Sequence, residues 1–387
     1  MTNANKEDNM TGSDEGRTAV KPGLFSNGFS LGKILLEGRA FLALIVIIVV
    51  FSLLSPDYFT FHNLVTMSSH VSIYALLAIG MLLVILNGGI DLSVGSTLGL
   101  SGIIAGYLMN GVNLKAMGIT MFPAVWVVVI VACAVGALIG VINGVLISRF
   151  KVAPFVATLG MLYVVRGVAL LITNGLTYNN LEGKPELGNT GFDWLGFNSL
   201  ASIPIGVYVM VIVAIIGSIV LNRTVFGRWL YASGGNERAA ELSGVPVKKV
   251  KVWVYVASGV CSAIAGIILS SELTSASPTA GNSYELTAIA AVVIGGASLM
   301  GGRGNIRGTL LGAFVIGFLS DGLVIIGISS YWQTVFTGAV IVFAVLLNAV
   351  QYRGRRKKQK PSATPPTTTS SNLAPPPSAP ELEKTAG

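Results

Sequence analysis

Polar residues able to form hydrogen bonds interrupt one of the most apolar stretches of this chain, ILNGGIDLSVGS at residues 85–96. Asn87 and Asp91 flank Gly88 and Gly89 there. Glycine weakens a helix, whereas asparagine and aspartate cap helix ends, so the stretch predicts a helix break. Unwound backbone survives at membrane depth only where protein or a water-filled cavity satisfies its polar groups. The break therefore either lines a pathway or helix junction, or is a plain turn in which Asp91 is simply an N-cap.

A second glycine-rich stretch occurs late in the chain, in VVIGGASLMGGRGNIRGTLLGAFVIGF at residues 292–318. Its clustered glycines are Gly295, Gly296, Gly301, Gly302 and Gly304. Two interruptions, one in each half of a chain, are typical of transporters built from repeats. Close helix packing through small residues is the alternative explanation for many of these glycines.

Three ionisable residues lie within or at the edge of apolar segments, where burial of charge is expensive. Arg166 is central in FVATLGMLYVVRGVALLIT, Asp321 lies in GFLSDGLVIIG, and Glu285 opens an apolar run. An ion pair between Arg166 and Asp321 would neutralise both, and a structural pair is favoured slightly over a substrate contact. Glu272 and Glu285 flank a polar loop, where solvation is favoured over partner docking.

Catalytic and metal-binding patterns are missing from the sequence. His62 and His70 lie together at one edge and are interpreted as surface or packing residues, and no paired-carboxylate cluster suits acid–base or metal chemistry. Cys133 and Cys261 lie in apolar runs without CxxC spacing. A membrane-embedded enzyme is therefore disfavoured, with neither catalytic nor metal-ligating residues expected.

Composition indicates the elements that must position these residues. The chain is 52% hydrophobic and 11% charged, with 47 glycines and a mean hydropathy of +0.74. These values predict an all-α polytopic membrane protein. Because a span needs about 20 apolar residues, we expect about ten transmembrane helices, near residues 40–55, 68–87, 91–109, 121–147, 154–173, 203–222, 251–271, 285–300, 306–327 and 331–350.

The distribution of charge predicts that both chain ends are cytoplasmic, since lysine and arginine gather in cytoplasmic loops. With ten spans, that side would hold Arg149, Lys151, Arg223, Arg228, Arg238, Lys248, Lys249, Lys251, Arg303 and Arg307. The outer loops would hold Asp57, Glu182, Glu186 and Asp193 with only Lys115 and Lys184. The net charge of +8 is then a topological signal, and no nucleic-acid partner is expected.

Three regions follow from this pattern. Residues 1–32 are polar and are expected to be disordered, and the first apolar run is interpreted as an uncleaved anchor. Residues 33–358 form the transmembrane domain, and residues 359–387 are a proline-rich tail that is also expected to be disordered.

The longest internal polar stretch, residues 223–251, contains one predicted surface helix in NERAAELSGV. Asn236 can cap it, Ala239, Ala240 and Leu242 give it a small apolar face, and Gly244 ends it. Such a helix suits insertion into a groove on a soluble partner; an ordinary connecting loop is the alternative.

Four segments together resemble a known family. NGGIDLSVGS, VAPFVATLGMLYVVRG, GGNERAAELSGV and GGASLMGGRGNIRGTLLGA are similar, in this order, to segments of monosaccharide-uptake permeases of ABC importers, the ribose, xylose and galactose type. The resemblance covers about residues 40–352, and AAELSG resembles the coupling helix that docks on the ATPase. The proline-rich tail departs from the family pattern.

The resemblance implies a set of partners and roles. These are a second permease copy, a cytoplasmic ABC ATPase that carries ATP and magnesium, and an extracytoplasmic sugar-binding protein. The chain itself has no GxxxxGK[ST] motif and would carry no cofactor. The implied ATPase-coupling residues are Asn236, Glu237, Ala239, Ala240, Glu241 and Gly244. The implied translocation path, which suits uncharged hydroxylated sugars, comprises Asn87, Gly88, Gly89, Asp91, Ser93, Ser96 and Asn305.

The sequence thus predicts a permease of the bacterial plasma (inner) membrane that moves a monosaccharide or small polyol inward by alternating access, with ATP hydrolysis on a separate subunit. An ion-coupled secondary transporter is the alternative, since it would also explain broken helices and the buried charges Arg166 and Asp321.

Overall fold

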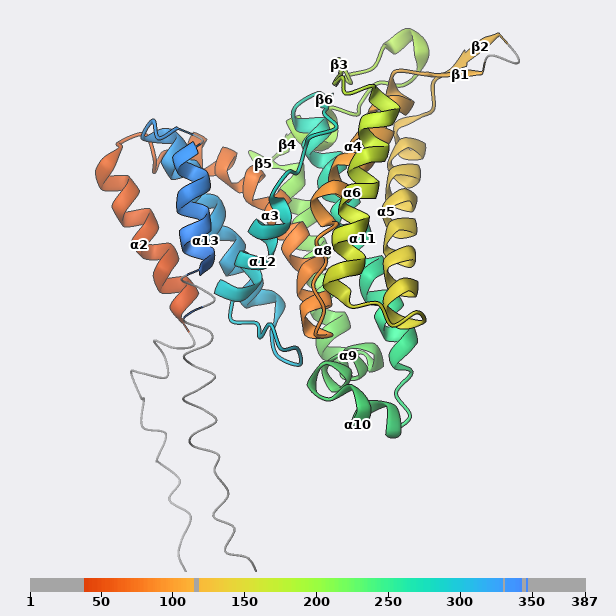
Figure 1. Ribbon diagram of the computed structural model, residues 1–387. Helices are drawn as coiled ribbons and strands as arrows, with labels where there is room; N and C mark the ends of the chain where they lie inside the picture. The colour runs from red at the N-terminus through yellow and green to blue at the C-terminus, as the bar shows by residue number, and fades with distance from the viewer. Residues whose placement is uncertain (1–37, 115–117, 330, 343–345, 347–387) are drawn as a thin grey trace, which may run out of the picture.

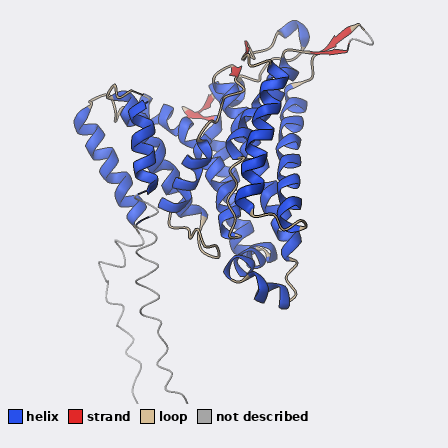
Figure 2. Cartoon of the chain, in the orientation of Figure 1, coloured by secondary structure: helices blue, strands red, loops and turns tan. Residues whose placement is uncertain are grey.

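The computed structural model describes residues 38–114, 118–329, 331–342 and 346, and it is mostly helical (Figure 2). Its helices are α2 (Arg39–Leu54), α3 (Phe61–Leu86), α4 (Val94–Met109), α5 (Val125–Ser148), α6 (Pro154–Thr173), α7 (Trp194–Phe197), α8 (Ile205–Arg223), α9 (Val225–Gly235), α10 (Glu237–Leu242), α11 (Val247–Glu272), α12 (Tyr284–Ile294) and α13 (Ile306–Ile325), with a 3₁₀ turn η1 (Pro185–Leu187). The two regions predicted to be disordered, 1–32 and 359–387, lie outside the described residues.

Six helices are long and apolar enough to cross a membrane: α3, α5, α6, α8, α11 and α13. Three shorter apolar segments, Ala40–Leu54, Val94–Met109 and Tyr284–Ile294, belong to α2, α4 and α12. The tenth predicted span, 331–350, is described only in part. Its residues 331–342 are helical. These helices agree with the membrane-protein class that composition predicts.

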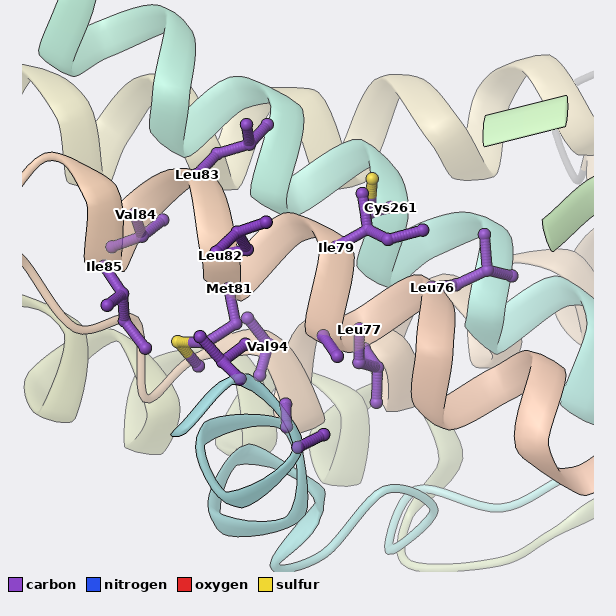
Figure 3. Close-up of a cluster of buried hydrophobic side chains, with 14 of the residues drawn as sticks. Leu76, Leu77, Ile79, Met81, Leu82, Leu83, Val84, Ile85, Val94 and Cys261 are labelled. Atoms are coloured by element: carbon purple, nitrogen blue, oxygen red, sulfur yellow. The ribbon is translucent and has the colours of Figure 1, made fainter. Parts of the chain in front are cut away.

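Helix α3 is the centre of the bundle. In its most apolar window 89% of the residues are buried, because it packs against α8, α11, α12 and α13. Figure 1 shows α2 and α13 on one side of it and α4, α5 and α6 on the other. Its leucines, isoleucines and valines form the main core with residues such as Val94 and Cys261 (Figure 3). A helix that is apolar all round is expected to be buried in this way.

Helices α5 and α11 pack closely along most of their length. Gly136, Gly140 and Gly144 of α5 face the α11 backbone, and a Cβ atom at Gly140 would collide with the carbonyl of Tyr255. Small residues at such contacts let two helix backbones approach. This packing explains part of the high glycine content without any functional role.

The two ends of the bundle differ. At one end lie three antiparallel strand pairs, β1 (Val112–Leu114) with β2 (Ile119–Met121), β3 (Tyr178–Asn179) with β6 (Ser275–Ala276), and β4 (Ser199–Leu200) with β5 (Ile203–Pro204). Their registers place Val112 opposite Met121, Tyr178 opposite Ala276 and Ser199 opposite Pro204. Helices α9 and α10 lie at the opposite end, which we call the α10 end (Figure 1).

Two predicted helix boundaries are wrong. Helix α3 begins at Phe61 rather than at residue 68, because the Thr60 side chain caps it by accepting a hydrogen bond from Asn63 N. Helix α12 ends at Ile294 rather than at residue 300, since Gly296 takes a positive φ of 93° that interrupts helical backbone. Helix α12 is therefore too short to cross a bilayer alone.

Candidate functional site at the helix breaks

The first break separates α3 from α4, and its polar groups are satisfied by the protein. Asp91 is 2% exposed. Its Oδ1 accepts hydrogen bonds from Ser93 N at 3.0 Å and Ser93 Oγ at 2.6 Å, and its Oδ2 accepts one from Ser258 Oγ of α11 at 2.9 Å. The N-cap of α4 is Ser93, so the interpretation of Asp91 as the N-cap is wrong. Its carboxylate instead ties the unwound segment to α11.

Two further helices hold the same segment. Asn143 of α5 donates from Nδ2 to Ser93 Oγ at 2.9 Å, and Thr158 of α6 donates to the carbonyl of Ile90 at 3.1 Å. Ser96 Oγ donates to the Ser93 carbonyl at 2.9 Å. Ser93 and Ser96 are buried like Asp91, so all three are turned into the protomer in this conformation. Their path-lining role stays a prediction, while their contacts explain how the break is held.

The second break, residues 295–305, meets the first. Gly302 N donates to the carbonyl of Leu86, the last residue of α3, at 2.9 Å. Gly301, with a positive φ of 84°, lies against the backbones of Gly88 and Gly234, where a side chain would be strained. Asn305 accepts from Gly308 N at 2.7 Å and is the N-cap of α13. Gly301 and Gly302 of the second break thus contact the first break at the α10 end.

The C-terminal end of α9 completes this contact. Asn87, next to Gly88 at the start of the break, donates from Nδ2 to Ser233 Oγ at 2.9 Å. Gly234 lies against the carbonyl of Leu86 and the amide of Gly302. The polar segment 223–251 therefore touches both breaks directly. Gly88 itself is exposed, and Gly89 is buried beside the Tyr255 hydroxyl.

Segment 223–251 folds into two helices before α11, not the single one predicted. Helix α9, which the sequence did not predict, has Thr224 as its N-cap, and the Thr224 hydroxyl accepts a hydrogen bond from Gly227 N. Helix α10 has the predicted cap, since Asn236 Oδ1 accepts from Ala239 N at 3.0 Å. Gly244 follows it with a positive φ of 83°. The sequence thus located the second helix and both of its ends.

Helix α10 presents most of its side chains to solvent. Glu237, Ala239 and Glu241 are exposed, and Leu242 is 75% exposed, whereas Ala240 is buried against the bundle. Lys251 Nζ of α11 pairs with Glu237 at 2.7 Å, which fixes the helix on α11. Helix α10 is therefore a short, solvent-exposed helix that Ala240 and the Glu237–Lys251 pair anchor to the bundle.

The charged residues within the bundle do not pair as expected. Arg166 donates from Nη1 to the carbonyls of Pro278 and Ala280, the latter at 2.7 Å. Asp321 Oδ1 lies 3.1 Å from His70 Nδ1, and Glu272 Oε1 lies 3.7 Å from His70 Nε2. The predicted ion pair between Arg166 and Asp321 is therefore not formed, and that prediction is wrong. His70 is not merely a surface or packing residue, since it joins α3 to α11 and α13.

The family model described as "Branched-chain amino acid transport system / permease component" matches residues 63–345, well over half of the chain and all of both breaks. The chain belongs to this permease family. Ribose import permease protein RbsC of Haemophilus influenzae is 42% identical over 333 residues, which cover 86% of this chain and 98% of that protein. RbsC of Escherichia coli K12 is 44% identical over 314 residues, 81% of this chain and 94% of the relative.

The galactose/methyl galactoside import permease protein MglC of Escherichia coli K12 is 35% identical over 329 residues, 83% of this permease and 96% of the relative. No solved structure matches the permease. The resemblance inferred from four segments is confirmed by these relatives. With its membrane-length helices, the permease is a multi-pass protein of the bacterial plasma (inner) membrane and a transport component, not a catalytic one.

Several functional contacts of the permease gave no signal in the sequence. Ser233 and Thr158 are unremarkable hydroxyl residues, yet each holds the first break. His70 carries only a weak signal, as a titratable group inside an apolar segment. Within the part of the chain that the structure describes, no group of three or more His, Cys, Asp or Glu side chains is placed to hold a metal ion.

Proposed function

We propose that this permease is the transmembrane subunit of an ATP-driven ABC importer that moves a monosaccharide, ribose in the first instance, into the cytoplasm by alternating access. The observation that carries the proposal is the 42% identity over 98% of a ribose import permease, a match long enough to include both breaks and α9–α10. A relative named for galactose and methyl galactoside import also supports small sugars as the substrate class.

We infer a ten-span topology with both chain ends in the cytoplasm. Three segments rich in lysine and arginine, 149–151, 223–251 and 303–307, adjoin the α10 end of the bundle (Figure 1). The connection that follows β3, at the opposite end of the bundle (Figure 1), holds the acidic residues Glu182, Glu186 and Asp193. Basic loops remain on the cytoplasmic side of bacterial membranes, so the α10 end is assigned to the cytoplasm.

The partners follow from that orientation. A cytoplasmic ABC ATPase, which supplies ATP and Mg²⁺, docks on α10 through Leu242, Ala239 and the exposed carboxylates, while Asn236 and Gly244 fix the two ends of the helix. A sugar-binding protein docks on the opposite end, and a second permease copy completes the pore. The chain lacks the GxxxxGK[ST] phosphate cradle, which agrees with nucleotide being bound elsewhere.

The geometry supports a simple coupling route. Closure of the ATPase moves α10, and α9 moves with it because Asn236 joins the two helices directly. Helix α9 contacts the first break through Ser233 and Asn87, and the second through Gly234 and Gly302. Movement at the cytoplasmic face therefore reaches the unwound segments without crossing a flexible linker.

Uptake by reconstituted vesicles tests the proposal. The permease is purified from its native membranes with the ATPase that it retains, and uptake of labelled ribose is measured with and without ATP on the α10 side and ribose-loaded binding protein on the other. We expect uptake only when both are present, and no effect of ionophores. Uptake driven by an ion gradient without ATP would contradict the proposal.

A further inference from the structure

A pocket of about 460 Å³ lies between α6 and the segment that leads into α12, and five leucines form the apolar part of its lining. Its polar lining consists of Tyr163, Arg166, Thr279, Asn282 and Glu285. None of the contacts that hold the two breaks is made by these five side chains. The pocket adjoins the first break at Leu92, while its polar side chains are distinct from those that form the junction at the α10 end.

The pocket lies at mid-depth in the bundle. Ser258, which binds Asp91 beside the start of α4, is roughly 16 Å along α11 from Val247 and roughly 21 Å from Glu272, at about 1.5 Å per residue. Gly95, in the first turn of α4, packs against Gly281, just before α12 begins. Helices α4 and α12 thus both begin at this level, as discontinuous helices do around transporter binding sites.

Two glycines of α4 make room for the charged groups of the pocket. A Cβ atom at Gly99 would lie 2.9 Å from Arg166 Nη1, and one at Gly95 would lie 2.5 Å from Glu285 Oε2. The guanidinium and the carboxylate therefore lie one helical turn apart on the same face of α4. Among the ion pairs of the described residues, none joins these two groups.

The exposure of the polar lining side chains indicates what medium the pocket faces. Arg166 and Glu285 are only partly buried, Asn282 and Thr279 are exposed, and Tyr163 is 70% exposed. Charged and amide groups at the middle of a bilayer are costly in contact with lipid, so they face water or another protein. On the proposed function, that space is the translocation path between two permease copies.

We propose that this pocket is the sugar subsite of the path, with Arg166, Glu285, Asn282 and Thr279 exchanging hydrogen bonds with sugar hydroxyls beside the exposed ring of Tyr163. A hydroxyl donates to Glu285 and accepts from Arg166, so one cationic and one anionic group in the same pocket suit a neutral polyol. An anion would be repelled by Glu285 and a cation by Arg166. The inference rests on the proposed function and adds a substrate site within the membrane.

The test compares uptake by the wild-type complex with uptake by Glu285→Gln, Asn282→Ala and Thr279→Val, at saturating ribose-loaded binding protein. Asn222→Ala, at an exposed asparagine of α8 whose amide bonds within its own helix, is the matched control. Each variant is first checked for retained ATPase association and ATP hydrolysis. We expect ribose uptake to fall about fivefold to tenfold in the pocket variants, the effect of losing one or two hydrogen bonds, and to be unchanged in the control.

The selectivity of uptake gives a second readout. With 2-deoxyribose, which lacks one hydroxyl, the pocket variants should lose less activity than with ribose. Wild-type rates for both sugars in all three variants would overturn the subsite. If Glu285→Gln does not insert, the two substitutions at the exposed Asn282 and Thr279 carry the test. Absence of ATP-driven uptake in the wild type would instead overturn the proposed function, so the two failures are distinguishable.

Discussion

Asn87 Nδ2 donates a hydrogen bond of 2.9 Å to Ser233 Oγ, and so joins the first helix break to α9. The backbone bond from Gly302 N to the Leu86 carbonyl, also 2.9 Å, brings the second break to the same place. A surface segment and two membrane breaks therefore share one contact. Because the hydrogen bond is short and partly buried, we expect any shift of α9 to displace the residues that lead to Asp91.

Removal of this bond should uncouple ATP hydrolysis from transport. We expect Asn87→Ala and Ser233→Ala each to lower the sugar imported per ATP hydrolysed by about threefold to tenfold, since a hydrogen bond contributes about 0.5–1.5 kcal/mol. ATPase association should be retained. The ratio is measured in reconstituted vesicles, and the double variant should resemble either single one. Asn222→Ala is the control, because Asn222 bonds only within α8; equal losses in this control would contradict the link.

Loss of the Asp91 carboxylate should destabilise the whole bundle. Asp91→Ala leaves the hydroxyls of Ser93 and Ser258 without their acceptor in a buried site, at a cost of about 1–3 kcal/mol for each unsatisfied group. We expect a clearly lower midpoint of thermal unfolding in detergent, with Asp91→Asn intermediate because it keeps one acceptor oxygen. Asp57→Ala, at an exposed position, should leave the midpoint unchanged. An unaltered midpoint in Asp91→Ala would show that the carboxylate does not hold the break.

The contact between α5 and α11 should tolerate no added methyl group. In Gly140→Ala the new Cβ would meet the backbone of Tyr255 and Val256, which cannot move aside as a side chain can. Overpacking of this kind costs about 1–3 kcal/mol, so expression and thermal stability should both fall. Gly160→Ala makes the same change in α6, where the new Cβ atom would have no atom within 4 Å beyond its own stretch of helix. Its stability should be equal or slightly higher, because alanine favours a helix; similar losses in both variants would contradict the packing account.

Local features of the fold were predictable from the sequence. The bounds of α6 are those expected, residues 154–173, because Pro154 starts the apolar run and Asn174, in left-handed conformation, follows it. The cap and stop of α10 were read from Asn236 and Gly244 in the same way. Such signals depend on residues close together in the chain, and these govern helix ends.

Contacts between distant residues were not predictable. His70 and Asp321 are 251 positions apart, and Asn87 and Ser233 are 146 apart, so only the tertiary fold brings each pair together. The predicted Arg166–Asp321 pair is wrong for this reason. Arg166 instead donates a hydrogen bond to the backbone carbonyl of Ala280, in the segment that leads into α12. Charge alone indicated that a partner was needed, without identifying it.

The central claim is that α10 docks on an ATPase, and the exposed Leu242 allows the most direct test. Gly244 is a poorer target, because any side chain there would strain a backbone with φ of 83° and disturb α10 itself. The measurement is co-purification of the ATPase with tagged permease from native membranes, for the wild type, Leu242→Glu and Leu200→Glu. Leu200 is an exposed leucine at the opposite end of the bundle and serves as the matched control.

The account predicts that the wild type and Leu200→Glu retain the ATPase, whereas Leu242→Glu inserts normally but loses most of it, together with ATP-driven sugar uptake. Retention of the ATPase by Leu242→Glu at the wild-type level would contradict the docking role of α10. Absence of any ATPase from the wild-type preparation would contradict the importer itself.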